Sequence, residues 1–376
     1  MFDFRTAFYL ITHSFSFKKG SLRFPSFKRL FFVFFVLPLF FFNTLINWIF
    51  LWLDELIFLS YHKTDLSKSV FIIGMPRSGT SFLLNLICAN KKDFTCFSLG
   101  EMVFAPSIIQ KYFYRIFSKL DEFVGKPLKK SILFIEKFLF KSTKGVHDIS
   151  FFANEEDEFL YLFLFRSIYL QYIFPDVERK LKLLNRDELN NTKSGQQMMR
   201  FYTNCVKRHN YFYNKSGHRY FVSKNPAYPG MIDLLSSNFP DSYFINPVRN
   251  QKDTFASTLS LNNRLLSGAC SVKESQPLKE ITIASLLKWD EKLKSFCKNS
   301  SFSSKILNLD FLDLTKNPFL MVQEIYKLLN IEMNQSAKDI YLAEENKSKR
   351  YKSPHNYESI TLDEIKNYKT NLANDN

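Results

Sequence analysis

Residues 69–81 constrain this chain more than any other stretch, because a buried strand pattern runs directly into a tight turn. The uncharged run 70–73 is β-branched and aromatic, and it ends at Gly74. The loop that follows closes at Gly79, and an apolar helical pattern begins at Phe82. The order strand, tight turn and helix predicts a cradle for an anion at the turn.

The physical basis of this cradle is the backbone of the turn. Gly74 and Gly79 permit conformations closed to other residues, so that successive main-chain N–H groups can point at one anion. The helix start adds unpaired N–H groups, and Thr80 and Ser81 add hydroxyls. The Gly-x4-Gly-Thr spacing is that of a nucleotide P-loop, but the P-loop lysine is missing and the cation is Arg77. An ATPase or GTPase is therefore disfavoured.

The second half of the chain alternates between strand and helix patterns. Strands are predicted at 219–223, 242–246 and 305–309, and helices at 229–239, 253–263, 283–296 and 317–329. Such alternation predicts an α/β fold with a mostly parallel central sheet flanked by helices, in which ligands lie beyond the carboxyl ends of the strands. Gly74, Lys224 and Arg249 fall at such ends.

Composition narrows the classes of partner. The 376 residues carry a formal charge of +15, which suits an anionic partner such as nucleic acid, membrane lipid or a phosphorylated cosubstrate. Nucleic acid is disfavoured, because the basic excess lies in the N-terminus and in aromatic helices and no recognition motif is present. The five Cys and six His are dispersed, which predicts neither a disulfide framework nor a metal site.

The sequence of the N-terminal region predicts membrane association. Residues 1–29 are basic and aromatic. Residues 30–53 contain no ionisable side chain, and this stretch is long enough to cross a bilayer. A helix in the membrane interface, a broken hairpin and a buried helix covering the soluble domain remain alternatives. A spanning helix would put the predicted α/β domain on the far side of the membrane from a cytoplasmic N-terminus, whereas a surface helix would leave that domain in the cytosol.

Two elements of this sequence carry a family resemblance. Pro76-Arg77-Ser78-Gly79-Thr80 after a buried strand resembles the 5′-phosphosulfate loop of sulfotransferases that use 3′-phosphoadenosine 5′-phosphosulfate (PAPS). Arg249 with Ser257 eight residues later resembles the 3′-phosphate-binding element of the same family, although 249–251 lacks the family's usual proline. Further resemblances to the bacterial and algal branch lie at 53–55, 101–107, 155–158, 224–226 and 353–357, so that the resemblance covers roughly residues 50–360.

This resemblance implies a P-loop-like fold and sulfuryl transfer from PAPS to a hydroxyl or amine of a small-molecule, glycan or lipid-linked acceptor. The loop at Pro76 to Ser81, with Arg77 and the amides of Gly79, Thr80 and Ser81, would hold the 5′-phosphosulfate. Arg249 and Ser257 would hold the 3′-phosphate, and Lys224 would be a second cation near the transferred group. Positioned cations and N–H donors should supply most of the transition-state stabilisation.

An acceptor hydroxyl also needs a general base. Glu101 corresponds in position to the carboxylate assigned as base in tyrosylprotein sulfotransferase-like enzymes, although the loop before it is a few residues longer here. His147, Glu155 and Asp157 are competing candidates. The acidic run 155–158 also suits the N-terminus of the apolar helix predicted at 159–172.

The predicted organisation has three parts. Residues 1–63 form the basic N-terminus and the hydrophobic segment, residues 64–360 the sulfotransferase domain with a helical acceptor-side insertion at 101–200, and residues 361–376 a polar tail. Aromatic helices at 108–120 and 128–140 are expected in the core, with a lid over an apolar or lipid-linked acceptor and a surface pressed against the membrane as alternatives. The alternative function is a non-catalytic, membrane-associated protein that binds a nucleotide on the same fold.

Overall fold

The computed structural model describes residues 3–18, 21–139, 149–174, 181–190, 192–269, 275–299 and 301–349. Its core is a five-stranded, fully parallel sheet in the order β2-β3-β1-β4-β5. The strands are β1 (Ser69–Ile72), β2 (Phe94–Thr95), β3 (Tyr220–Lys224), β4 (Tyr243–Val248) and β5 (Ile306–Asp310). This arrangement confirms the α/β fold and the parallel sheet predicted from the sequence. Strand β1 is the central strand, so the turn that follows it lies in the middle of the row formed by the carboxyl ends of the strands.

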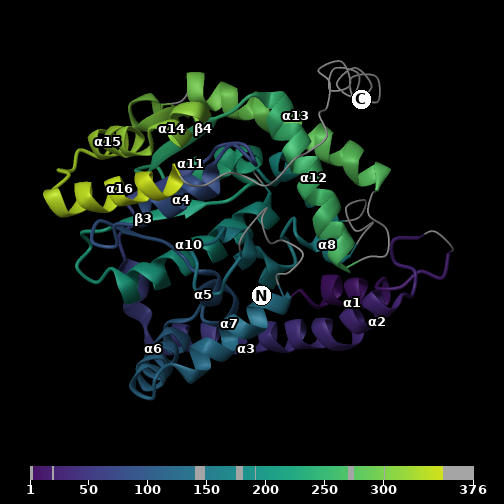
Figure 1. Cartoon of the computed structure of the whole chain (residues 1–376). Helices are drawn as coiled ribbons and strands as arrows, with labels where there is room; N and C mark the ends of the chain where they lie inside the picture. Colours follow the sequence, from purple (N-terminus) through teal and green to yellow (C-terminus); the bar gives the residue numbers. More distant parts are fainter. Residues whose placement is uncertain are drawn as a thin grey trace.

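Helices cover both faces of the sheet (Figure 1). Phe71 of β1 points into a cluster with α10 (Lys193–Tyr213), α11 (Ile232–Asn238), α12 (Gln251–Ala269) and α13 (Gln276–Asn299). Val70 and Ile72 point the other way, into a cluster with α4 (Thr80–Ile87), α15 (Pro318–Leu328) and α16 (Gln335–Ser348). Because successive strand residues face opposite sides, an uninterrupted apolar strand such as β1 requires both layers of helices.

The shorter elements connect these layers. They are η2 (Leu59–Lys63), α5 (Leu99–Phe104), η3 (Asp157–Leu164), α8 (Leu170–Ile173), η4 (Arg186–Leu189), η5 (Tyr228–Met231), η6 (Ser303–Lys305) and α14 (Phe311–Lys316). The predicted helix at 159–172 is wrong as one element, because it divides into η3 and α8. Phe165 separates the two with a positive φ of 52°, which an α-helix cannot contain.

The 21-residue helix α10 was not predicted, although it crosses the core. The start of α10 falls within residues 176–197, a polar and charged run with no steady apolar period. Arg208, His209 and Asn210 of this helix are buried. Polar residues on the buried side remove the apolar period that identifies a helix in sequence.

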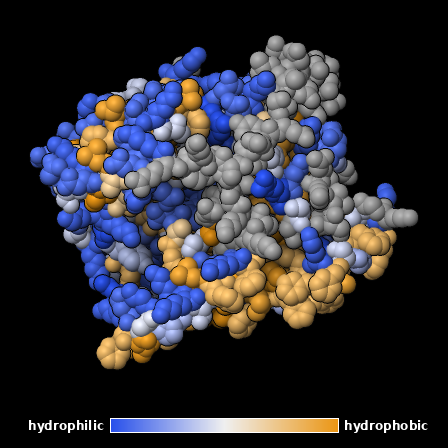
Figure 2. Space-filling view, in the orientation of Figure 1, coloured by the Kyte–Doolittle hydropathy of each residue, from blue (hydrophilic) through white to orange (hydrophobic). Residues whose placement is uncertain are grey.

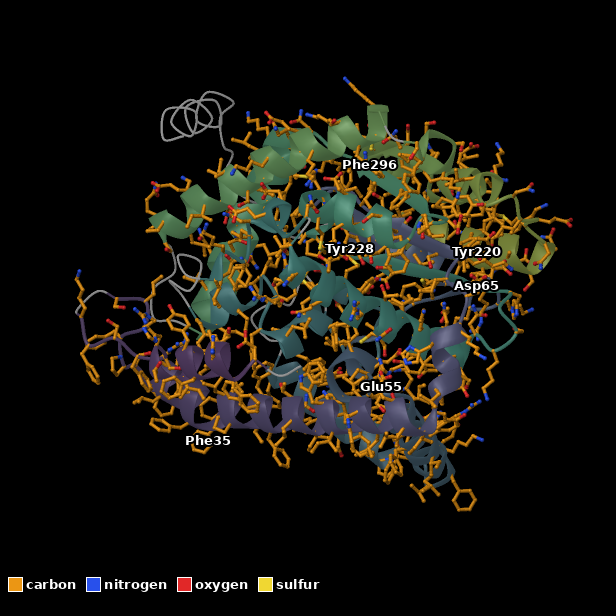
Figure 3. The ribbon with its side chains drawn as sticks, turned by 180° about the vertical axis from the view of Figure 1, so that it is seen from behind. Phe35, Glu55, Asp65, Tyr220, Tyr228 and Phe296 are labelled. Atoms are coloured by element: carbon orange, nitrogen blue, oxygen red, sulfur yellow. The ribbon has the colours of Figure 1, made fainter. Side chains whose placement is uncertain are left out.

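The N-terminal helices lie on the side of the molecule opposite α14 and α15 (Figure 1). They are α1 (Phe4–Thr12) and a continuous helix made of α2 (Phe27–Phe31), the π-helical turn η1 (Phe32–Val36) and α3 (Leu37–Ile57). The amphipathic helices α6 (Ile108–Phe123) and α7 (Pro127–Leu139) agree closely with the two predicted aromatic helices. Figure 3 shows Phe35 and Glu55 near opposite ends of the long helix.

Candidate active site

The turn after β1 has the tight backbone that an anion cradle requires. Gly79 lies in the left-handed region with φ 88°, and Arg77 does so with φ 65°. At Gly74, an added Cβ would lie 2.7 Å from both Pro247 Cγ and Ser78 Oγ, so no larger residue fits without movement. The Ser78 hydroxyl donates to the carbonyl of Met75 at 2.6 Å, which closes the turn. The fold therefore holds this loop in one shape before any ligand binds.

The side chains predicted to bind the two phosphate groups come together around Arg77. Arg77 Nε donates to Ser257 Oγ at 3.1 Å, although 180 residues separate them. A guanidinium N–H of Arg249 donates to the Arg77 carbonyl at 2.9 Å. Ser257 is buried in the first turns of α12, and Arg249 follows the end of β4. The two sequence elements therefore form one cluster of cations and a hydroxyl at the carboxyl ends of the central strands.

Phe311, the first residue of α14, packs against both Arg249 and the turn at Gly79. The Arg249 guanidinium lies over the Phe311 ring, 4.5 Å from its centroid. The same ring lies where a Cβ on Gly79 would contact it at 3.1 Å. One aromatic ring thus fixes both the turn and the second arginine.

Lys224 lies at the end of β3 and reaches the cradle. Its Nζ lies 3.3 Å from Ser81 Oγ, and it forms a buried ion pair with Oε1 of Glu156. The other carboxylate oxygen of Glu156 accepts a hydrogen bond from the hydroxyl of Tyr169. A cation, a carboxylate and a phenol therefore form a chain that starts at the first turn of α4.

Three successive acidic residues each hold a different residue at the end of β3. Glu156 pairs with Lys224. Asp157 Oδ2 accepts the hydroxyl of Ser223 at 2.6 Å, and Glu158 Oε2 accepts the amide of Asn225 at 2.9 Å. Glu158 also forms a buried ion pair with Arg186 at 2.7 Å. The acidic run therefore positions the 223–225 segment, beyond any effect of its charge on a helix dipole.

Asp157 lies in a buried group of hydroxyl side chains. It also accepts a hydrogen bond from Tyr202 at 2.5 Å, and Tyr228 contacts the same Ser223 hydroxyl at 2.5 Å. Figure 3 shows Tyr228 in the interior. Burial raises the pKa of Asp157 to about 7, although the hydrogen bonds from Ser223 and Tyr202 act in the opposite direction.

Glu101 lies in α5 and contacts two buried basic side chains. Its Oε1 lies 2.7 Å from Nδ1 of His209 and 3.2 Å from Nζ of Lys111. Burial acts to raise the pKa of Glu101, but His209 and Lys111 outweigh burial and lower it. Burial lowers the pKa of Lys111, although Glu101 acts to raise it. His209 Nε2 in turn lies 2.8 Å from the hydroxyl of Thr95. Glu101 is thus the centre of a buried charge network between α5, α6 and α10.

Comparison with known proteins agrees with this geometry. A family model described as the sulfotransferase family matches residues 69–335, which includes every described element of the candidate site. The chain belongs to the sulfotransferase family. No curated protein sequence matches it.

Two solved sulfotransferases share the fold of this family member. Sulfotransferase STF1 from Mycobacterium tuberculosis H37Rv is 14% identical, with a TM-score of 0.69 over 97% of this chain and 91% of its own. Sulfotransferase STF9 from Mycobacterium avium is 12% identical, with a TM-score of 0.69 over 99% of this chain and 91% of its own. At such identities the likeness concerns the fold, and it extends through the N-terminal helices.

The predicted site residues of this sulfotransferase fall into three groups. One group lies together at the carboxyl ends of the strands and consists of the loop from Pro76 to Ser81, Arg249, Ser257 and Lys224. Glu101 and Asp157 are buried in separate networks, and Glu155 is buried with its backbone N–H on the Phe97 carbonyl at 3.2 Å. His147 and the 353–357 motif lie outside the described residues.

Sequence reasoning missed Glu156, the carboxylate that pairs with Lys224. Four acidic residues stand in a row, and their spacing does not identify which one faces β3. Among the described residues, no group of three or more His, Cys, Asp or Glu could hold a metal ion. The prediction that this sulfotransferase needs no metal therefore stays a prediction.

Proposed function

We propose that this sulfotransferase takes its sulfuryl group from PAPS and transfers it to a hydroxyl or amine. One observation carries the choice of donor: Arg77, Ser257 and Arg249, which resemble the family's two phosphate-binding elements, are linked by hydrogen bonds of 3.1 and 2.9 Å. A donor with phosphate groups at both the 5′ and the 3′ positions requires two such elements side by side. ATP requires only one of them.

The residues of the turn fit the 5′-phosphosulfate. The Gly74 backbone admits no side chain, and Gly79 begins α4 in the left-handed region, so main-chain N–H groups at the start of α4 are exposed to a bound anion. Arg77 would add its cation, and the Thr80 and Ser81 hydroxyls would add donors. Arg249 and Ser257 would bind the 3′-phosphate.

The reaction breaks one bond and forms one bond. The sulfur–oxygen bond to the bridging oxygen of PAPS breaks, and that oxygen keeps the electron pair as part of the departing 3′-phosphoadenosine 5′-phosphate (PAP). A new bond forms between sulfur and the acceptor oxygen or nitrogen, and the acceptor's proton passes to a base. Lys224, which reaches Ser81, would stabilise charge on the bridging oxygen.

We propose Glu156 as that base. It pairs with Lys224 and is therefore the described carboxylate in direct contact with the cation assigned to the transferred group. Glu101, Glu155, Asp157 and His147 remain predictions for the same role. The exposed aromatic side chains of α6 and α7 favour an apolar or lipid-linked acceptor over a free sugar.

Calorimetric binding of PAP to the full-length chain, compared with AMP and ATP, tests the donor. A 3′-phosphate held by charge-assisted hydrogen bonds of about 1.5–3 kcal/mol should make PAP bind roughly 10- to 100-fold more tightly than AMP. Arg77→Ala and Arg249→Ala should each lose at least tenfold in PAP affinity. Lys327→Ala, which removes an exposed cation on α15, is the matched control and should bind PAP normally.

Equal affinity for PAP and AMP, or a preference for ATP with Mg²⁺, would exclude PAPS as the donor. Release of PAP from PAPS in the presence of phenols, alcohols and amines then tests turnover. Tight PAP binding without any release would instead favour the alternative of a nucleotide-binding protein on this fold.

A further inference from the structure

From Leu30 onward, the long N-terminal helix presents an apolar outer side. The helix Phe27–Ile57 is long and apolar enough to cross a membrane, and only 17% of its most apolar 18-residue stretch is buried. Its exposed large side chains recur every three or four residues, which places them on one side of a helix. They include Phe35, Leu39, Phe42, Leu45, Ile49 and Trp52.

The polar side chains of the same helix point the other way, into the protein. The amides of Asn43 and Asn47 both donate to the carbonyl of Val103 at 2.8 Å. The Trp48 indole N–H donates to the carbonyl of Phe163 at 3.2 Å. The helix is therefore attached to the catalytic domain along its length by one side.

The C-terminal end of the helix is fixed by a buried charge. Asp54 forms an ion pair with Arg208 of α10 at 2.9 Å, and it accepts the backbone N–H of Ile108 at the start of α6 at 2.8 Å. A helix that crossed a bilayer would be surrounded by lipid, so these contacts would have to separate. Leaving one partner of a buried ion pair uncompensated is strongly destabilising. The structure therefore opposes a spanning orientation.

The apolar outer side continues onto neighbouring helices. On α1 the exposed residues are Phe4, Phe8 and Ile11, and on α6 they are Phe113, Ile116 and Phe117. Figure 2 shows hydrophobic side chains gathered along the side of the molecule that carries α1 to α3. We call the exposed apolar side chains of α1, the Phe27–Ile57 helix and α6 the apolar face.

Exposed basic side chains lie on helices that carry the apolar face and on α7. Exposed Lys and Arg side chains stand on α1, α2, α6 and α7, at Arg5, Lys28, Lys119, Lys129, Lys130 and Lys137. In the described part of these four helices, the one exposed carboxylate is Glu122, which pairs with Lys126 at 2.9 Å. An apolar strip with a cationic rim matches the acyl chains and anionic headgroups of a lipid leaflet.

We propose that the apolar face docks this protein onto one leaflet of an anionic bilayer, with the Phe27–Ile57 helix lying in the plane of the membrane. Trp52 and the Phe side chains enter the headgroup boundary, while the domain stays on the side from which it docked. A second copy of the chain is a poorer occupant, because two-fold pairing would bring the same cations together. The proposal does not depend on the donor proposed above, and it shares the exposed aromatic side chains of α6 with the argument for an apolar acceptor.

Flotation of the full-length chain with vesicles tests docking. The chain should float with vesicles of phosphatidylcholine and phosphatidylserine at 7:3, and less with pure phosphatidylcholine. Phe35→Asp combined with Phe42→Asp should reduce the floated fraction at least tenfold. The matched control is Leu320→Asp combined with Leu342→Asp, which charges two exposed apolar residues on α15 and α16 and should float like the parent.

Impermeant maleimide labelling of Lys18→Cys and Lys68→Cys tests orientation, since these exposed residues flank the two ends of the helix. In sealed membrane vesicles from expressing cells, both variants should label alike above the parent chain's background. Opposite labelling would show a spanning helix and overturn the proposal. Unchanged flotation of the double Phe variant, or a dimer in lipid-free solution that this variant abolishes, would also overturn it.

Discussion

Replacement of Glu101 by glutamine should destabilise the fold rather than act mainly on the chemical step. The substitution keeps the shape of the side chain and removes its charge. Lys111, whose side chain is fully buried, would then lose its anionic partner and keep neutral acceptors such as the carbonyls of Ala105 and Pro106, each at 2.8 Å. His209 would lose the carboxylate at 2.7 Å.

The expected loss follows from the burial of the pair. Removing one partner of a buried ion pair costs about 3–5 kcal/mol, because the other charge stays desolvated without compensation. With an unfolding entropy of about 2.1 cal/mol/K per residue over roughly 300 ordered residues, this loss lowers the melting temperature by roughly 5–8 °C. Combining Glu101→Gln with Lys111→Met removes both charges and should recover most of the loss.

Thermal unfolding of both variants, together with PAP release from PAPS, provides the test. The pKa of Glu101 is lowered in the folded state, so its contribution is present above the ordinary carboxyl pKa of 4.5 and is lost as the pH falls through the folded value. The parent should therefore lose its advantage over Glu101→Gln in acid. A variant that melts like the parent at pH 7 and yet loses PAP release more than a hundredfold would refute this reasoning and make Glu101 the base.

Three further predictions concern the site. Lys224→Ala and Glu156→Gln should each lower PAP release from PAPS by roughly 100-fold or more while PAP affinity, measured by calorimetry, changes only a few-fold; parallel losses in both would contradict a role in the chemical step. Because burial raises the pKa of Asp157 from 3.8 to about 7, its contribution to stability is complete below pH 4 and is lost as the pH rises through 7. At about 1.4 kcal/mol per pKa unit, the parent should lose about 3 kcal/mol of stability between pH 5 and pH 8, and urea unfolding of Asp157→Asn at these two pH values should show no such loss. Gly74→Ala should cost about 1–3 kcal/mol and weaken PAP binding, since its Cβ would press on Pro247 and Ser78 at 2.7 Å; normal PAP binding would show that the turn can adapt.

Local features of the site were predictable from the sequence. The turn after β1 depends on residues that adjoin in the chain, and Gly74 and Gly79 identify it without tertiary information. The strand patterns of β3, β4 and β5 lay within two residues of their observed bounds. Because the carboxyl ends of parallel strands lie at the same end of the sheet, the convergence of Lys224 and Arg249 on the turn also followed from the sequence.

Some local predictions failed for physical reasons. The two-residue strand β2 gave no pattern, because its pairing with β3 is decided by the sheet. Helix α10 was missed, because Arg208 and His209 on its buried side pair with Asp54 and Glu101 instead of packing as apolar residues. A buried polar residue and an exposed one look the same in a hydropathy pattern.

The sequence by itself determined the strand–turn–helix cradle, the parallel sheet and the apolar N-terminal helix, because each depends on residues that are neighbours in the chain or on one period. Only the tertiary structure decided that Glu156 pairs with Lys224 and that Glu101 pairs with Lys111 and His209. It also decided that Asn43, Asn47 and Asp54 turn the long helix flat against the domain. Those partners lie up to 154 residues apart, and burial selects among carboxylates and amides that spacing cannot tell apart.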